Sequence, residues 1–356
     1  MREILEDLKK WRANGKSIAV ATIVKVDGSP MRPLGSKMAV TTDRGISGSV
    51  TGGCIEGAVY EEAQQVIQSG KPRIVRYGVA SDQTPWEIGL TCGSSLDVLI
   101  EPMYSAPWNL AWEPIQNAIE KYQLLACVTL ISGETLGAKL LVLEDGSQQG
   151  SLGSPDLDRA ALDAVQKRLV SEDSSNVSLD VAGQTAEVFI DIFIPPSRLF
   201  IVGAVHIAIP LVELARTLGF YTLVLDPRKT FNSRERFPTA DELVVEWPAD
   251  ALAARHPDAG TYVAVVSHDE KLDNPAIAVA LKHGVKYVGV LGTKRKIPQR
   301  MDALRELGVS DEQLKNLHAP IGLNLGAIQP EEIALSILAE MVAVRHGRAQ
   351  NNNPSA

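Results

Sequence analysis

Residues 35–67 read GSKMAVTTDRGISGSVTGGCIEGAVYEEAQQVI, and the same pattern returns without a gap at residues 137–169 as GAKLLVLEDGSQQGSLGSPDLDRAALDAVQKRL. The identical positions are, in order, Gly35, Lys37, Val40, Asp43, Gly48, Ser49, Ala58 and Gln64, matched by Gly137, Lys139, Val142, Asp145, Gly150, Ser151, Ala160 and Gln166. The flanking apolar runs also match, 19–24 with 126–131 and 96–101 with 186–191. We therefore predict that the first part of the chain is a duplicated α/β unit.

The repeat also separates the residues that folding requires from those that only one copy carries, because both copies must fold. Copy one alone has the loop 28–33, the turn 52–54 and the stretch 86–93. Within the aligned stretch, Cys54 of copy one matches Asp156 of copy two. These features of copy one are therefore the candidates for function.

Hydrophobic periodicity and prolines indicate the domain boundaries. Copy one is expected to span 1–103 and copy two 104–195, together forming one domain that ends at the pair Pro195-Pro196. From 196 to 350, short β-branched runs alternate with helices of apolar period, which predicts a Rossmann-like, doubly wound parallel sheet. The polar residues 351–356 are expected to form a disordered tail.

Composition excludes several classes of protein. The chain has 356 residues with 45% apolar and 22% charged content, as in ordinary globular proteins. Its net charge of −8 gives no general attraction to nucleic acid or to anionic membranes. No apolar run is long enough to span a bilayer. Three scattered cysteines are too few for a disulfide framework and favour a reducing, cytoplasmic setting.

Cys54 is the sharpest signal, because Gly52 and Gly53 allow a tight turn just before a predicted helix. A helix start stabilises a thiolate, and its free amide groups could also bind an anion. The alternative is a small residue packed beside a turn. The local pattern around Cys92 alone favours a structural thiol, but copy two lacks this cysteine, which favours a function. Cys127 lies in an apolar strand and is assigned to the core. Arg32, in the stiff loop of copy one, could pair with an anion.

The second domain carries a partial dinucleotide-binding pattern. Gly203 and His206 lie between a predicted strand and a helix, and Asp226 ends the next strand, where a ribose-binding acid would fall. Val205 occupies the place where a second glycine would let the backbone approach a pyrophosphate. We therefore expect weak or no binding of NAD(P), and a nicotinamide-dependent oxidoreductase is the rival hypothesis.

Further polar residues follow the other predicted strands of this domain. Each would ordinarily be a solvated surface group, but parallel strands bring their carboxyl ends to one edge. Together they predict a pocket for an anion or a phosphate. The candidates are Arg228, Arg236, His268, Asp269, Gly292, Thr293 and Arg295.

Several of these segments are long enough to carry a family resemblance. The segments 28–30, 35–38, 48–57 and 90–93 resemble the N-terminal domain of the XdhC/CoxI family. The chain also resembles the C-terminal domain of this family, in the segments 226–228, 236–238, 267–269, 289–293, 319–326 and 330–333. The family usually has glycine where this chain has Val205 and Ser94.

The resemblance implies an accessory protein that binds molybdenum cofactor, as molybdopterin or its dinucleotide, assists its sulfuration and delivers it to an apo molybdenum hydroxylase. Such clients are of the xanthine dehydrogenase, aldehyde oxidoreductase or carbon monoxide dehydrogenase type. It also implies a homodimer and a cysteine desulfurase as sulfur donor. Cys54 and Cys92 would be the catalytic thiols, with Cys54 as a molybdenum ligand, and Gly52, Gly53 and Glu56 would contact the cofactor. A ligand-free interaction paralogue is the third hypothesis.

Overall fold

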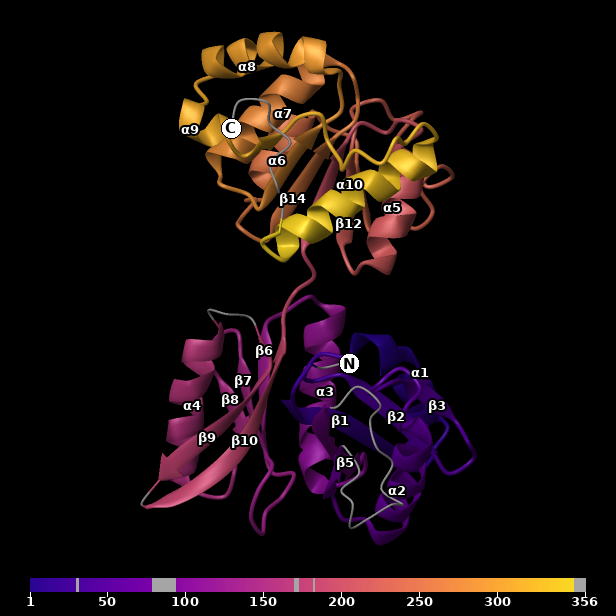
Figure 1. The fold of residues 1–356 in the computed structure, drawn as a ribbon, viewed down its shortest axis with the longest axis vertical. Helices are drawn as coiled ribbons and strands as arrows, with labels where there is room; N and C mark the ends of the chain where they lie inside the picture. Colours follow the sequence, from indigo (N-terminus) through magenta and orange to yellow (C-terminus); the bar gives the residue numbers. More distant parts are fainter. Residues whose placement is uncertain (30–31, 79–93, 170–172, 182, 349–356) are drawn as a thin grey trace. The chain divides into compact units, whose positions relative to one another are not determined.

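The structure is a computed structural model that describes residues 1–29, 32–78, 94–169, 173–181 and 183–348. The expected tail 351–356 lies outside the described residues. The chain forms two compact units, Met1–Pro195 and Pro196–Ala356, drawn in Figure 1. The two units meet in sequence at the proline pair.

The first half of the N-terminal unit is an antiparallel sheet with strand order β3-β2-β1-β5-β4. Helix α2 lays Val59, Ala63 and Val66 against this sheet, and Gly70 ends the helix in the left-handed conformation, with φ of 66°. The elements are α1 (Arg2–Ala13), β1 (Ile18–Asp27), β2 (Lys37–Thr41), β3 (Ile46–Gly48), α2 (Glu56–Ser69), β4 (Arg73–Tyr77) and β5 (Ser95–Pro102).

The second half repeats this arrangement, with strand order β8-β7-β6-β10-β9. Each strand therefore occupies the place of its counterpart, and the predicted duplication is confirmed. The elements are α3 (Ala106–Glu120), β6 (Leu125–Leu130), β7 (Lys139–Leu143), β8 (Gln148–Gly150), α4 (Pro155–Leu169), β9 (Ser175–Val181) and β10 (Gln184–Phe193).

The repeated lysines join the two halves through buried ion pairs. Lys37 of copy one lies 2.8 Å from Asp191 of copy two, and Lys139 of copy two lies 3.0 Å from Glu101 of copy one. Each lysine also donates to a threonine of its own sheet. Because a buried charge is costly without a partner, this reciprocal pairing explains why both copies need the lysine.

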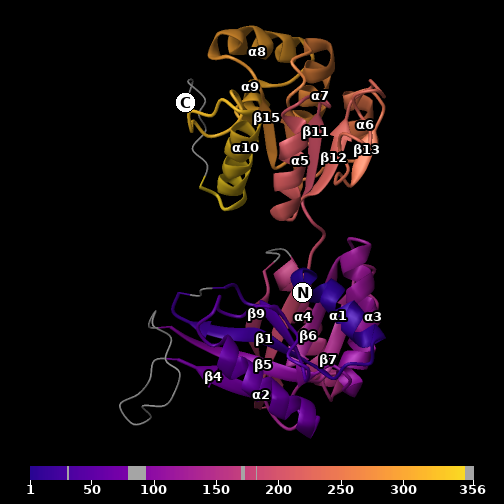
Figure 2. The same ribbon diagram turned by 90° about the vertical axis from the view of Figure 1, so that its right-hand side faces the viewer.

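The C-terminal unit is built on a parallel sheet, in the described residues ordered β13-β12-β11-β14-β15-β16. Helices α5 and α10 cover one face and α6 and α7 the other, an arrangement that Figure 2 makes visible and that confirms the doubly wound class. The strands are β11 (Arg198–Val202), β12 (Tyr221–Leu225), β13 (Glu242–Val244), β14 (Thr261–Val265), β15 (Tyr287–Val290) and β16 (Leu317–His318). The helices are α5 (Ala208–Thr217), α6 (Pro248–Ala254), α7 (Glu270–Lys282), the 3-10 turn η1 (Lys294–Lys296), α8 (Ile297–Glu306), α9 (Asp311–Leu314) and α10 (Pro330–Arg345).

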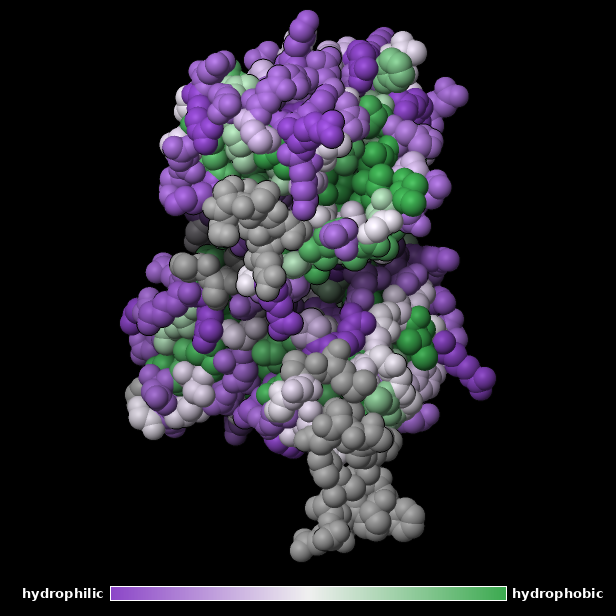
Figure 3. Space-filling view, turned by 45° about the horizontal axis from the view of Figure 1, so that its top comes forward, coloured by the Kyte–Doolittle hydropathy of each residue, from purple (hydrophilic) through white to green (hydrophobic). Residues whose placement is uncertain are grey.

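The surface of the C-terminal unit is not uniformly polar. Figure 3 shows apolar side chains, in green, gathered on the face of this unit that it presents. Leu325, Ile328 and Leu335, at 56%, 80% and 54% exposed, are among the large apolar side chains of this unit that lie outside its two cores. No helix of the described chain is long and apolar enough to cross a membrane.

Candidate functional site

The loop that precedes α2 is organised by one carboxylate. Oε1 of Glu56 accepts hydrogen bonds from Ser49 Oγ at 2.5 Å and from the amides of Thr51 and Gly52 at 2.8 and 2.9 Å. Oε2 accepts from Thr51 Oγ1 and from the amide of Gly53, both at 2.8 Å. The first residue of α2 thus binds back to the loop that leads into it, as helix-start carboxylates commonly do.

These contacts keep Glu56 ionised. Burial, the largest single influence, acts to raise the pKa of Glu56, but the hydrogen bonds from Ser49, Thr51 and the loop backbone together lower that pKa well below its ordinary range. The expectation that these loop amides are free for an external anion is therefore wrong, because the protein's own carboxylate occupies them.

Copy two contains a smaller version of the same clamp. Asp158, which matches Glu56 in the repeat, accepts from Ser151 Oγ and from the amide of Leu152, both at 2.7 Å. The carboxylate at this position therefore belongs to the shared fold. Pairing Ser49 and Glu56 with Ser151 and Asp158 is a signal that the sequence contains, although the motifs alone do not reveal it.

Cys54 lies just outside the helix. Helix α2 begins at Glu56, whereas α4 begins at Pro155, three positions earlier in the repeat, so copy one uses residues 51–55 as an irregular loop. Cys54 is exposed in this loop, and its amide donates to Thr51 Oγ1 at 3.2 Å. The thiol is therefore carried by a clamped loop two residues before the helix, close to the helix start as the two glycines predicted.

The two glycines leave the backbone of this loop open. Gly52 and Gly53 have φ of 85° and 125°, which side chains rarely adopt, and no other group lies within 4 Å of the place where a Cβ would be. A ligand could therefore approach the main chain directly beside Cys54. Glycine is required at both positions by the backbone conformation alone.

The other predicted members of this site have separate locations or cannot be placed. Arg32 donates to both carboxylate oxygens of Glu3 on α1 at 2.9 Å, so the structure gives this arginine an acidic partner within the protein. Cys92 lies outside the described residues. Residues 28 and 29 do contact the residue that precedes β5, because Ser94 Oγ donates to the carbonyl of Ser29 at 3.0 Å and lies close to the Cβ position of Gly28.

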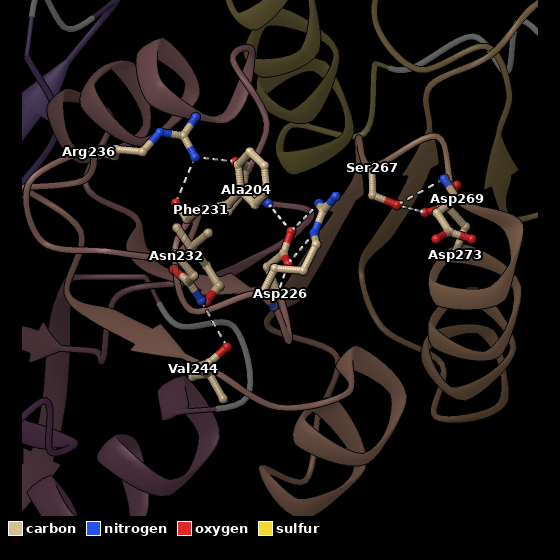
Figure 4. Close-up of polar contacts among 11 residues, drawn as sticks. Ala204, Asp226, Phe231, Asn232, Arg236, Val244, Ser267, Asp269 and Asp273 are labelled. Carbon is tan, nitrogen blue, oxygen red and sulfur yellow. Dashed lines mark hydrogen bonds and ion pairs between the residues drawn. The ribbon is translucent and has the colours of Figure 1, made fainter.

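In the C-terminal unit, neighbouring groups of the protein itself bind the carboxylate of Asp226. Its carboxylate is fully buried and accepts from the amide of Ala204 at 2.8 Å and from Arg228 Nη2 at 2.7 Å, as Figure 4 shows for the amide bond. Burial acts to raise the pKa of Asp226, but the hydrogen bonds from Arg228 and Ala204 outweigh it and lower the pKa. The predicted ribose-binding acid is thus already engaged.

Phe231 and Arg236 contact the same region, the turn that follows β11 at Gly203 and Ala204. Arg236 donates to the carbonyls of Ala204 and Phe231, both at 2.7 Å, as Figure 4 also shows, and the Arg228 guanidinium lies 4.7 Å from the Phe231 ring. The structure therefore brings the two predicted arginines together at the glycine turn. Sequence reasoning missed Phe231, which no motif distinguishes from an ordinary surface aromatic residue.

Crowding at this turn arises at Gly203. Gly203 has φ of 105°, and a Cβ there would lie 2.5 Å from the Cβ of Ser267 on the neighbouring strand end. Val205 is absent from the described residues with positive φ. The obstacle that Val205 presents to a pyrophosphate is therefore the bulk of its side chain and not an unfavourable backbone conformation.

The remaining candidates follow β14 and β15, on the other side of the point where the strand order reverses. His268 has a left-handed φ of 63°, and Asp269 caps α7 by accepting from the amide of Lys271 at 3.0 Å. After β15, Gly292 and Thr293 lead into η1, where Arg295 is exposed beside two lysines. Exposed His206 follows β11 across the same reversal point, where open α/β sheets bind their ligands.

The described part of the chain contains no group of three or more histidine, cysteine, aspartate or glutamate side chains that could hold a metal ion. The prediction that Cys54 ligates molybdenum requires only one protein sulfur, so it is compatible with this finding and stays a prediction.

The fold and the sites define a two-domain protein with a duplicated antiparallel unit, a single-copy cysteine loop and a Rossmann-type unit. Family models match both parts: the XdhC and CoxI family model matches residues 11–78, and the XdhC Rossmann domain model matches 199–341. The chain belongs to the XdhC and CoxI family.

Relatives of known description cover nearly the whole chain. A Bacillus subtilis protein described as a probable xanthine dehydrogenase subunit is 26% identical over 92% of each chain. The molybdenum cofactor insertion chaperone PaoD of Escherichia coli is 28% identical over 97% of this chain and 88% of its own. A crystal structure described as a xanthine dehydrogenase from Bacillus halodurans aligns with a TM-score of 0.77 and 28% identity over 98% of each chain.

Proposed function

We propose that this chain is a maturation chaperone that binds molybdenum cofactor and delivers it to an apo molybdenum hydroxylase. Two relatives, one named as a cofactor insertion chaperone and one as part of a xanthine dehydrogenase, support this class of function. The observation that carries the proposal is the exposed Cys54 on a loop that only copy one has and that Glu56 holds in place.

The residues of the loop suit a dithiolene-bearing molybdenum ligand. Sulfur is a soft donor, and Cys54 would supply it from the protein. The open backbone at Gly52 and Gly53 would allow close approach, while Glu56 would act by positioning the loop. Cys92 would be the second thiol, serving the proposed sulfuration with a cysteine desulfurase as donor. The proposal also includes a homodimer.

A separate site for a phosphate or a nucleotide is assigned to the carboxyl edge of the C-terminal sheet. Arg228 has a side chain that is 47% exposed although it pairs with Asp226, and Arg295 is exposed at η1. Guanidinium groups recognise phosphate through paired N–H donors. Charge loss at Arg295 should therefore weaken binding of a phosphate-bearing ligand at this edge without affecting the fold.

The test compares wild-type protein with Cys54→Ser, Cys92→Ser and Cys127→Ser after expression with cofactor supply. Bound molybdenum and pterin are measured by elemental analysis and fluorescence, and melting temperatures are recorded for each variant. We expect the first two variants to lose the cofactor and Cys127→Ser to retain it, because Cys127 is a buried core residue. Equal losses in all three, with lowered melting temperatures, would contradict the assignment.

A further inference from the structure

Copy two contains a groove beside its first helix, α3. The groove has a volume of about 670 Å³ and lies between α3 and the β7–β8 turn. Its apolar wall includes Leu110, Ala118 and Leu143, and its polar rim includes Glu113, Glu144 and Asp145. This volume falls in the range of sites that bind small ligands or large side chains.

The duplication shows why the space exists. Helix α1 stands before β1 as α3 stands before β6, and the matching of 19–24 with 126–131 aligns Trp11 with Ala118. Trp11 is only 8% exposed and reaches to 3.0 Å from the Cβ position of Gly45, in the turn between β2 and β3. In copy two an alanine replaces this indole, so the corresponding space is left open.

A basic group is missing from copy two in the same region. In copy one, Lys16 pairs with Asp43 at 2.7 Å. Asp43 matches Asp145, but the position of Lys16 is taken by Gln123, which also lines the groove. Copy one thus has a tryptophan and, five residues later, a lysine where copy two has Ala118 and Gln123, while both copies keep the acid.

The negative charge of the rim indicates that the groove binds a positively charged group. Glu113, Glu144 and Asp145 make no ion pair with any other described residue, and Lys121 is the basic residue among those that line the groove. Helix α3 ends at Glu120 and its last turn lines the groove through Asn117 and Ala118, so the negative end of the helix dipole favours a cation there. An aromatic ring that carries a nearby positive charge is therefore complementary to both wall and rim.

We propose that this groove binds a protein partner through a segment that presents an aromatic side chain followed, about five residues later, by lysine or arginine. The segment would occupy in copy two the places that Trp11 and Lys16 fill in copy one. The aromatic side chain would pack against the apolar wall, and the basic group would pair with Asp145. This interaction is separate from the cofactor loop and does not depend on the function proposed for it.

The probe is the acetylated and amidated peptide WRANGK, which is the chain's own sequence from Trp11 to Lys16. Binding to the full-length protein is followed by NMR shift changes of the peptide. We expect saturable binding with a dissociation constant of about 1 mM or tighter. Ala118→Trp, which copies the filled state of copy one, should weaken binding at least tenfold, whereas Gln116→Trp on the same helix outside the groove should not.

Two further comparisons keep the test decisive if Ala118→Trp folds poorly. Asp145→Lys changes an exposed side chain and should weaken binding of WRANGK, and the peptide ARANGK should bind at least tenfold more weakly than WRANGK. Absence of saturation by WRANGK at about 5 mM would overturn the proposal. So would equal binding of both peptides, or unchanged affinity in Asp145→Lys and Ala118→Trp.

Discussion

Replacing Glu56 with glutamine should loosen the cysteine loop without unfolding its domain. Glutamine keeps one acceptor oxygen but places an NH₂ group where the second carboxylate oxygen was. If that group replaces Oε2, the amides of Gly53 and Ile55 lose an acceptor, while the Thr51 hydroxyl can turn and accept. Two charge-assisted bonds at about 1.5 kcal/mol each give a loss of about 3 kcal/mol, roughly a hundredfold in the local opening equilibrium.

Hydrogen exchange of the loop amides measures this opening directly. We expect faster exchange across residues 50–55 in Glu56→Gln, with exchange in β1 and β5 unchanged. Asp158→Asn is the matched control in copy two, because its amide can donate to Ser151 Oγ and its remaining oxygen can accept from Leu152. Its effect should stay below about 1 kcal/mol. An exchange rate in Glu56→Gln within threefold of the wild type would refute the clamp.

The acid dependence of the clamp follows from the lowered pKa of Glu56. A carboxyl group with a folded pKa below its unfolded value stabilises the fold above the unfolded value, which is about 4.3 for glutamate. This contribution declines as the pH falls below that value toward the folded pKa. The difference in loop protection between wild type and Glu56→Gln should therefore be complete at neutral pH and shrink only in strong acid.

Three other changes test the remaining contacts. Lys37→Met should destabilise the N-terminal unit by about 3–5 kcal/mol in urea unfolding, because Asp191 is left without its lysine. Adding Asp191→Leu should recover most of that loss, and no recovery would argue against a paired role. Asp226→Asn should lower the melting temperature at pH 7 but have progressively less effect as the pH falls below about 4, since the pKa of Asp226 is lowered in the fold; an equal effect at all pH values would point to packing. Val205→Gly should raise NAD(P) affinity measured by calorimetry, from a wild-type dissociation constant no tighter than about 1 mM; micromolar binding by the wild type would favour the oxidoreductase hypothesis.

The sequence predicts the fold better than it predicts the contacts of individual side chains. Matching glycines, lysines and apolar runs identify the duplicated unit, and alternating runs identify the parallel sheet, because both patterns are local and periodic. The partner of Arg32 is Glu3, from a helix that precedes it by a whole strand, and nothing in the spacing of the loop indicates this pairing. The pairing of Asp226 with Arg228 likewise depends on side-chain orientation within a turn, which the sequence does not indicate.

The missed role of Glu56 shows how the repeat can be used more fully. A residue present only in copy one is a functional candidate, but a residue whose chemistry persists in copy two belongs to the fold. Cys54 passes this test, because Asp156 replaces it. Glu56 does not, because Asp158 repeats its clamp with a shorter side chain. Applying both halves of the test to every motif residue would have assigned Glu56 correctly from sequence alone.

The same comparison, made in the opposite direction, identifies what copy two has gained. Copy one begins its second helix late and thereby presents Cys54, whereas copy two begins that helix early and has no thiol there. Copy two in turn lacks the tryptophan with which copy one packs its first helix against the sheet, and a groove lies beside Ala118 at that position. The buried lysine pairs hold both halves together regardless of these differences. Each copy has thus diverged at a position where the shared fold tolerates a change, which is where a duplicated fold can acquire separate binding sites.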